Sequence, residues 1–405
     1  MKNIFTLFLG FILLLGVNLT SCTTDKDTYQ LLPENLKKSS KIRGYTLTSI
    51  EQLGKSIYFD KISSPNNMAC ADCHAAMSGF TGSIVGINIH GSVYRGADAQ
   101  NFGNRKPPSA AYATFSPVFH YDYSEGLFIG GNFWDGRATG ERLGSPAAEQ
   151  ALGPFLNPAE HNLSNKLDVI MKIAQAKYAA MWPTVFGEPL KYSTDEEIDL
   201  NYDRIGYAIA AFEGSPEVNQ FSSKFDYVKK GLAQFTPEEE WGFQLFNDEE
   251  KGKCALCHIS DGDKPLFTDF TFDNVGTPKN LANPVYKYDP GFIDLGLGGY
   301  LLTRTDALKD LAYDNMGKHK VPTLRNVDKK PGLGFTKAYM HNGVFKSLKE
   351  VVHFYNTRDV EVWPIAEVPE NINDDELGNL GLSDAEEDAI VAFMKTLSDG
   401  YIVKQ

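Results

Sequence analysis

The sequence of 405 residues lacks the features of a nucleic-acid-binding, fibrous or disordered protein. Lysine and arginine total 39 against 52 aspartate and glutamate residues, so the net charge of −13 leaves no basic excess to displace the counterions of a phosphate backbone. With 36 glycines and 20 prolines, the chain is too poor in both for collagen or low-complexity sequence. Aromatic residues make up 12%, more than a long disordered chain contains. We therefore expect a globular protein of roughly two or three domains that does not bind nucleic acid.

Long hydrophobic runs are also missing, except for one at the N-terminus. Residues 4–17 form an apolar run that is too short to cross a bilayer comfortably and is typical of a signal-peptide core. The run leads into Leu19-Thr20-Ser21-Cys22, which resembles the processing box of bacterial lipoproteins and implies cleavage before Cys22 and a lipid anchor on its thiol. A plain secretory signal with a chance cysteine is the alternative. Both predict a mature chain in the periplasm or cell envelope, with residues 1–22 as the signal peptide and 23–45 as a tether.

Cysteine is scarce, and four of the five cysteines form two copies of one motif. The copies are Cys70-Ala71-Asp72-Cys73-His74 and Cys254-Ala255-Leu256-Cys257-His258. The C-x-x-C-H motif attaches c-type haem, because its two thiols add to the vinyl groups of a porphyrin and its histidine binds the iron. A thioredoxin-like pair would need a βαβ context, a four-thiolate zinc site has its pairs about 15–20 residues apart, and disulfides would leave both histidines unexplained. The sequence therefore predicts two covalently bound haem c groups, held by Cys70, Cys73, Cys254 and Cys257.

Each haem motif lies between two predicted helices. Capping boxes at Thr48–Glu51 and Thr236–Glu239 predict a helix start before each motif. Apolar residues at helical spacing predict an amphipathic helix that closes each half, at residues 196–212 and 383–397. A helix before C-x-x-C-H and a helix at the domain end are what a cytochrome c domain uses to hold its haem edge. The pattern indicates a diverged tandem repeat.

The sequence between these helices offers few strands. Alternating apolar and polar residues are scarce, while glycine- and proline-rich segments such as 79–117 and 268–299 predict long loops. We therefore expect a mainly α protein with two cytochrome c-like domains in tandem and long irregular loops. The N-terminal domain would span residues 46–225, and the C-terminal domain would span residues 226–405.

Further segments along the chain carry a family resemblance. They are Phe133–Arg137, Gln150–Pro154 leading to Glu160, Val321–Val327, Tyr339–Gly343 and Ser347–Tyr355. In this order, and with the two haem motifs, they resemble the bacterial di-haem cytochrome c peroxidases and the related methylamine-utilisation-type di-haem oxidases. The resemblance implies a homodimeric enzyme that reduces H2O2 to water with electrons from a small donor protein such as cytochrome c. The N-terminal haem would be the low-potential, peroxidatic one, and the C-terminal haem the high-potential electron acceptor.

The resemblance also implies the axial iron ligands, which are His74 and His90 on the N-terminal haem and His258 and Met340 on the C-terminal haem. His90 matches the family's detachable distal ligand, so that reduction of the other haem would release it and open the iron to peroxide. Met340 matches the distal ligand that raises the potential of an electron-accepting haem. Met316 is a rival for that position, and the adjacent Tyr339 would resemble the methylamine-type oxidases instead.

The resemblance assigns catalytic roles to residues between the motifs. Glu160 matches the acid–base residue that moves a proton between the two oxygens of peroxide. Gln150 would orient peroxide, and Trp134 matches an indole that lies between the two haems. An exposed glutamate and a tryptophan that serves only packing are the plain alternatives.

A calcium ion between the domains is a further feature of the family. The loop Asn104–Ser109 matches that feature only partly, since Lys106 stands where the family commonly has asparagine. Two other functions remain open at this point. One is a di-haem oxidase that acts on another substrate, and the other is a di-haem electron-transfer protein without catalysis.

Overall fold

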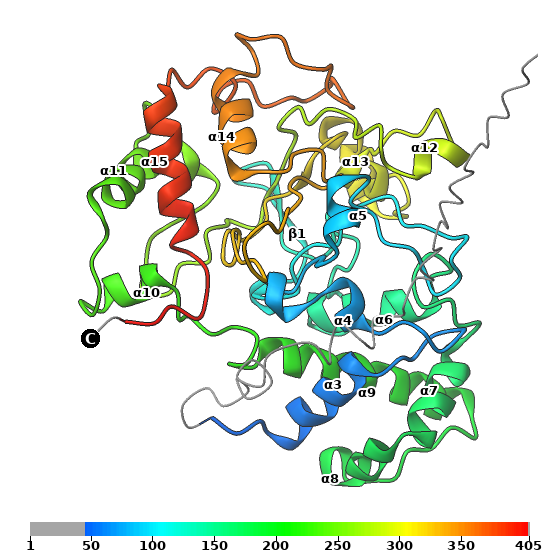
Figure 1. The fold of residues 1–405 in the computed structure, drawn as a ribbon. Helices are drawn as coiled ribbons and strands as arrows, with labels where there is room; N and C mark the ends of the chain where they lie inside the picture. The colour runs from blue at the N-terminus through cyan, green and yellow to red at the C-terminus, as the bar shows by residue number, and fades with distance from the viewer. Residues whose placement is uncertain (1–44, 404–405) are drawn as a thin grey trace, which may run out of the picture. The chain divides into compact units, whose positions relative to one another are not determined.

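In the computed structural model, which describes residues 45–403, helix α3 (Ser49–Phe59) begins at the first predicted capping box and α11 (Pro237–Asn247) at the second (Figure 1). The backbone N–H of Thr48 donates to the Glu51 carboxylate at 2.6 Å, and that of Thr236 donates to the Glu239 carboxylate at 2.7 Å. Each box therefore satisfies a backbone donor that a helix N-terminus would otherwise leave free. Both predicted helix starts are confirmed.

Each of these helices crosses the helix that closes its half of the chain. Helix α3 packs on α9 (Asp195–Gly214), and α11 packs on α15 (Asp384–Lys395). Figure 1 shows α15 in red beside α11, and α3 in blue beside α9. Glycine permits both close crossings: a Cβ atom on Gly54 would lie 1.7 Å from the carbonyl oxygen of Ala208, and one on Gly242 would lie 1.8 Å from that of Ala389. The same contact thus occurs once in each half.

The remaining elements are short. The other α-helices are α4 (Cys70–Cys73), α5 (Val85–Ile89), α6 (Pro146–Leu156), α7 (Lys166–Gln175), α8 (Trp182–Phe186), α10 (Lys224–Lys229), α12 (Val285–Tyr288), α13 (Gly296–Leu301) and α14 (Leu348–Thr357). The 3-10 helices are η1 (Ala76–Ser78), η2 (Ala113–Phe115), η3 (Lys177–Met181), η4 (Cys254–Leu256), η5 (Ala307–Leu311) and η6 (Tyr313–Asn315).

Strands are few in the described part of the chain. Strand β1 (His120–Asp122) pairs with β2 (Leu127–Ile129), and β3 (Phe272–Asp273) pairs with β4 (His319–Lys320), both antiparallel. The mostly helical character with little sheet is as predicted. The two segments predicted as long loops are less irregular than expected, because the first contains α5 and the second contains β3, α12 and the start of α13.

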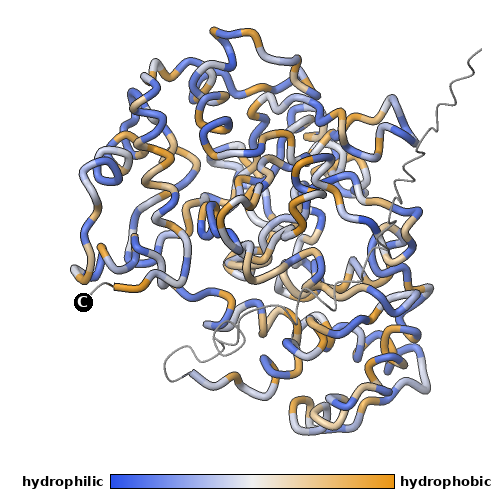
Figure 2. The backbone as a smooth tube through the Cα atoms, viewed as in Figure 1, coloured by the Kyte–Doolittle hydropathy of each residue, from blue (hydrophilic) through white to orange (hydrophobic). Residues whose placement is uncertain are grey.

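The hydrophobic core falls into separate clusters. The buried members of the first cluster lie between Leu53 and Val218, and those of the second lie between Phe225 and Leu397. A third, smaller cluster surrounds Phe119, Phe272 and Leu297. Figure 2 shows apolar and polar stretches alternating along α15, as expected for a helix with one buried face. The predicted domain boundary between residues 225 and 226 stays a prediction.

Some of the sequence predictions concern the N-terminal segment. The signal peptide of residues 1–22, lipidated Cys22 and almost all of the tether lie outside the described residues. Among the helices within residues 45–403, none combines the length and the apolar character needed to cross a bilayer.

Candidate active site

The first C-x-x-C-H motif folds into a single helical turn, α4, that presents His74. The turn closes through a hydrogen bond from the His74 backbone N–H to the Cys70 carbonyl at 3.0 Å. The His74 ring places Nδ1 3.2 Å from the carbonyl oxygen of Phe80. Because a carbonyl can only accept, Nδ1 carries the proton and Nε2 keeps its lone pair. Burial lowers the pKa of His74 to about 4, so the ring is neutral and able to bind a metal through Nε2.

The second motif repeats this arrangement. The His258 backbone N–H donates to the Cys254 carbonyl at 2.9 Å, and Nδ1 of His258 lies 2.8 Å from the carbonyl oxygen of Phe267. Burial again lowers the histidine pKa to about 4. Phe80 and Phe267 both have positive φ, at 58° and 54°, which turns each carbonyl towards its histidine. Both halves therefore prepare one imidazole nitrogen as a metal ligand.

The four thiols lie in two separate cavities, each beside its own histidine. Cys70, Cys73 and His74 line what we call the first cavity, and Cys254, Cys257 and His258 line the second cavity. All four cysteines are free, and burial raises the pKa of every thiol, that of Cys254 to about 12. A zinc site that joins both pairs does not fit this arrangement, because the pairs do not meet. Two thiols and a free imidazole nitrogen beside one cavity fit a haem c, and this fit occurs twice.

The residues predicted for peroxide chemistry meet at the first cavity. Gln150 on α6, Glu160 after that helix and Trp134 all line it together with His74. The Glu160 carboxylate accepts a hydrogen bond from the side-chain amide of Asn157 at 2.8 Å. Burial raises the pKa of Glu160, while the Asn157 hydrogen bond and the positive charge of Arg137 oppose the rise. The first cavity therefore holds a carboxyl that is easier to protonate than an ordinary surface glutamate.

His90 is not brought to this cavity. It follows α5, its side chain is exposed, and it does not line the cavity that holds His74. Its segment is attached to the loop that carries Met340. The Asn88 side-chain amide donates to the Thr336 carbonyl at 3.0 Å, and the Ser92 hydroxyl donates to the Gly343 carbonyl at 3.2 Å.

Met340 and Tyr339 both line the second cavity beside His258. The Tyr339 hydroxyl makes a long hydrogen bond to the Val327 carbonyl at 3.4 Å. Met316 is absent from that lining and lies instead in the third hydrophobic cluster. The geometry thus excludes Met316 from the second cavity and leaves Met340 and Tyr339 there, together with Met394 of α15.

Trp134 borders both cavities. It is 8% exposed, and its indole N–H donates to the Lys106 carbonyl at 2.8 Å. A segment of the second half, Lys320–Thr323, also lines both cavities. Trp134 therefore lies beside both haem motifs, and its redox role stays a prediction.

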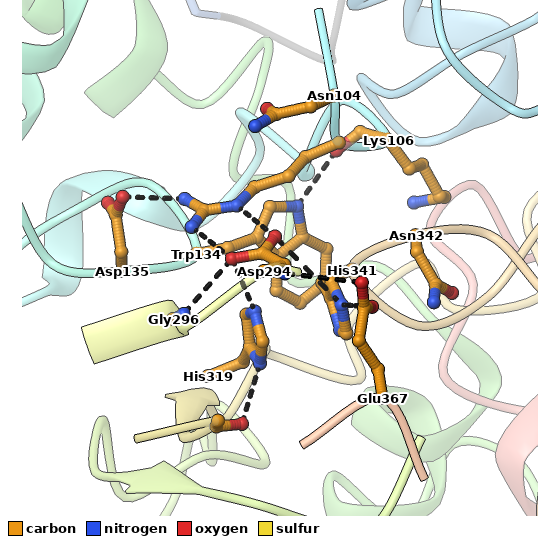
Figure 3. A network of polar contacts seen from close by, with 12 residues as sticks. Asn104, Lys106, Trp134, Asp135, Asp294, Gly296, His319, His341, Asn342 and Glu367 are labelled. Carbon is orange, nitrogen blue, oxygen red and sulfur yellow. Dashed lines mark hydrogen bonds and ion pairs between the residues drawn. The ribbon is translucent and has the colours of Figure 1, made fainter. Parts of the chain in front are cut away.

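A buried polar network lies against the second cavity (Figure 3). The rings of His319 and His341 stack with centroids 3.6 Å apart, and both residues line the cavity with Asp294. Arg105 binds both oxygens of Asp294 at 2.6 Å and reaches Asp135 at 2.6 Å. The pairing holds the pKa of Asp294 well below its usual range, despite burial. Because Arg105 lines the first cavity and Asp294 lines the second, this pair lies in the wall between the two cavities.

Sequence reasoning missed several residues of these sites. Glu213 on α9 lines the first cavity, and burial raises its pKa to about 8. Arg105, Asp294 and the stacked histidine pair form contacts across long sequence separations. The predicted helix ended at residue 212, one residue before Glu213. His341 lies within the Tyr339–Gly343 segment, but no motif marks Arg105, Asp294 or His319.

The loop Asn104–Ser109, where the sequence suggested a calcium ion, contains a buried lysine. Lys106 is buried at 9% exposure within the loop Asn104–Ser109. The Asn104 carbonyl oxygen is already used, since it accepts a hydrogen bond from the Asn283 side chain at 2.7 Å. A buried ammonium would repel a second cation at short range, so these residues do not fit a calcium ion at this loop.

Two c-type haem sites with a tryptophan between them, in a mostly helical fold, define a di-haem c-type protein. The family model for di-haem cytochrome c peroxidase matches residues 48–234. The methylamine utilization protein MauG of Paracoccus denitrificans is 33% identical over 371 residues, which cover 87% of this chain and 89% of MauG. The chain therefore belongs to the di-haem cytochrome c peroxidase family, which implies two c-type haems.

Two other similar proteins carry peroxidase names. The cytochrome-c peroxidase IdrP2 of Denitromonas iodatirespirans is 27% identical over 358 residues, 86% of this chain and 81% of IdrP2. The crystal structure of the diheme peroxidase BthA of Burkholderia thailandensis has a TM-score of 0.74 and 29% identity, and the match covers 88% of this chain and 87% of BthA. Homologues of this kind support an oxidoreductase.

Proposed function

We propose that the protein is a peroxidase that reduces one H2O2 to two waters with two electrons and two protons, and that the electrons come from a small donor such as a c-type cytochrome. The observation that carries the proposal is Glu160 beside His74 at the first cavity, with Gln150 on the same lining. The peroxidase names of IdrP2 and BthA support it. A protein that only carries electrons would not need a buried carboxyl at this place.

Glu160 would move the proton of the reaction. Haem held by Cys70, Cys73 and His74 would supply the electrons for cleavage of the O–O bond. One oxygen of Glu160 accepts the proton of the near peroxide oxygen and returns it to the far oxygen, which leaves as water. The raised pKa suits the return of the proton, because burial makes this carboxyl easier to protonate, while the Asn157 hydrogen bond supports the charged form that first accepts the proton. The Gln150 amide would hold peroxide in line with that carboxyl.

Electrons would enter at the second site and pass Trp134. Met340 is proposed as the distal ligand, because a thioether with histidine raises the iron potential and suits an electron acceptor. Trp134 supports the route by bordering both cavities with its large π-system. Lipid anchoring through Cys22, a place in the periplasm or cell envelope, and a homodimer belong to the same proposal.

Reductive release of His90 is the regulatory part of the proposal. We infer that the conformation with His90 outside the first cavity is the open one, and that His90 binds the first iron in the oxidised protein. The contacts of Asn88 with Thr336 and of Ser92 with Gly343 support coupling, because they tie the His90 segment to the loop of Met340. A change in the Met340 loop would therefore reach the His90 segment through the hydrogen bonds of the flanking residues.

A second candidate function is an oxidase of the methylamine-utilisation type. Tyr339 on the second cavity favours it, since a tyrosine ligand would resemble those enzymes, and MauG is the relative at 33% identity. The test is a count of donor molecules oxidised per H2O2 consumed by the purified di-haem protein. The peroxidase proposal expects two one-electron donors per peroxide at every turnover. Peroxide consumption without matching donor oxidation would support the oxidase and contradict the peroxidase.

A further inference from the structure

Two lysines, one from each half, occupy corresponding places in the sequence and line the same two cavities. Lys106 stands two residues before Pro108, and Lys320 stands two residues before Pro322. Each of the two lysines lines both the first and the second cavity. Since each follows its own haem motif in the chain, the repeat brings one ammonium from each half to the same wall.

Neither ammonium has an acidic partner within residues 45–403. The Lys106 Nζ atom lies 3.3 Å from both the Thr81 hydroxyl and the Pro107 carbonyl, and 5.9 Å from the centroid of the Trp134 ring. The Lys320 Nζ atom donates to the Ser116 hydroxyl at 2.7 Å and lies 4.9 Å from the centroid of the Phe270 ring. Neither makes an ion pair, although the wall is otherwise rich in paired charges such as that of Arg105 with Asp294.

Burial of unpaired ammonium groups is costly. Burial lowers the pKa of Lys106 to about 8 and that of Lys320 to about 7, with the charge of Asp269 opposing the second shift. A buried charge without a counter-charge is destabilising, and proteins normally pair it. The described residues therefore provide no ion-pair partner for these two ammonium groups, and an anion in the cavities would stabilise them.

Haem supplies such anions, because every haem carries two carboxylates at its edge. We propose that Lys106 and Lys320 bind haem carboxylates at the wall between the two cavities, and that these ammonium groups provide the positive charge there without a calcium ion. The inference rests on the two haem sites of the proposed function but not on peroxide reduction. Cations near both irons favour the reduced form of each, so both lysines would raise both haem potentials.

The test uses the holoprotein with Lys106→Met, Lys320→Met and the control Lys318→Met. Lys318 is a neighbour of Lys320 in the chain but lines neither cavity. Spectroelectrochemical titration without peroxide should show both midpoint potentials lowered in the first two variants and unchanged in the control. Unchanged potentials in both cavity variants would overturn the proposal. Because peroxide is absent, failure here is separate from failure of the peroxidase proposal.

Two further measurements keep the proposal falsifiable. If a methionine variant does not retain both haems, Lys106→Arg and Lys320→Arg should retain them with nearly unchanged potentials, and equal haem loss in the arginine variants would contradict carboxylate binding. Elemental analysis of the holoprotein should find only trace calcium, and a calcium chelator should leave the haem spectra unchanged. One calcium per chain, with a spectral change on its removal, would refute the claim that the lysines suffice.

Discussion

The side-chain amide of Asn157 holds the carboxylate of Glu160 through a hydrogen bond of 2.8 Å. Asn157 directly follows α6, and its own backbone carbonyl also accepts the Glu160 N–H at 2.9 Å. The end of one helix therefore sets both the position of the carboxyl and the balance between its charged and neutral forms. Asn157 thereby positions the Glu160 carboxyl at the first cavity, where it can accept and donate a proton.

Asn157→Ala should move the acidic limb of the pH–rate profile to higher pH. The Asn157 hydrogen bond lowers the Glu160 pKa against the effect of burial, so its loss raises that pKa further. A hydrogen bond to a charged group contributes about 1.5 kcal/mol, which corresponds to roughly one pH unit. Since Glu160 must be ionised to accept the peroxide proton, turnover on the acidic side of the profile should fall in the variant and recover as the pH rises. An unmoved limb, or one that moves to lower pH, would contradict the role of Glu160.

Trp134→Phe should slow electron transfer between the haems. Trp134 borders both cavities, and phenylalanine removes the larger π-system together with the N–H that binds the Lys106 carbonyl. Flash or stopped-flow reduction of the second haem, followed at the first, measures the rate. Trp182→Phe is the matched control, because Trp182 is fully buried in the first hydrophobic cluster and lines neither cavity. Equal rates of electron transfer in the two variants would contradict a redox role and indicate that Trp134 serves only packing.

The helices and the haem motifs were accessible from the sequence, whereas the wall between the cavities was not. Capping boxes and helical spacing are local signals, and they predicted α3, α9, α11 and α15 within a few residues. The family resemblance singled out Glu160, Gln150 and Trp134, which line the first cavity, and their catalytic roles stay predictions. Such signals depend on neighbours in the chain or on recognised segments.

The wall depends on contacts that no local pattern encodes. The stacked rings of His319 and His341 and the Arg105–Asp294 pair join residues that are distant in sequence. Lysine is usually exposed to water, so the sequence could not predict that Lys106 is buried. His90 illustrates the opposite case: its sequence position suggests an iron ligand, but the structure places its side chain on the surface.

The midpoint potential and the spectrum of the second haem should show whether Met340 or Tyr339 is its distal ligand. Met340→Ala should lower the midpoint potential of the second haem and remove the charge-transfer absorption of a thioether–iron bond, because methionine raises the potential of a histidine-ligated haem. Tyr339→Phe should leave both properties unchanged, since only a long hydrogen bond to the Val327 carbonyl is lost. If Tyr339→Phe changed these properties and Met340→Ala did not, the result would support the oxidase candidate and contradict Met340 as the ligand.

His90→Gly should remove the need for pre-reduction. If His90 binds the first iron in the oxidised protein, glycine leaves that position open, and the oxidised variant should react with peroxide at once. Electron paramagnetic resonance of the oxidised protein should then show a high-spin signal in place of a low-spin one. The exposed His120 serves as the control, and His120→Gly should behave as the wild type. A His90 variant that still requires reduction would remove His90 from the gate.

The central claim is that one carboxyl at the first cavity performs the proton transfer of peroxide reduction. Glu160→Gln and its control Glu213→Gln test it most directly, because both residues line that cavity. The pKa of Glu213 is about 8, so this carboxyl is protonated at pH 7 and the neutral amide of glutamine resembles it. The measurement is steady-state oxidation of a reduced one-electron donor by H2O2. The account predicts that Glu160→Gln loses about 10²–10⁴-fold in turnover, whereas Glu213→Gln stays near the wild type. Wild-type turnover in Glu160→Gln, or an equal loss in both variants, would contradict it.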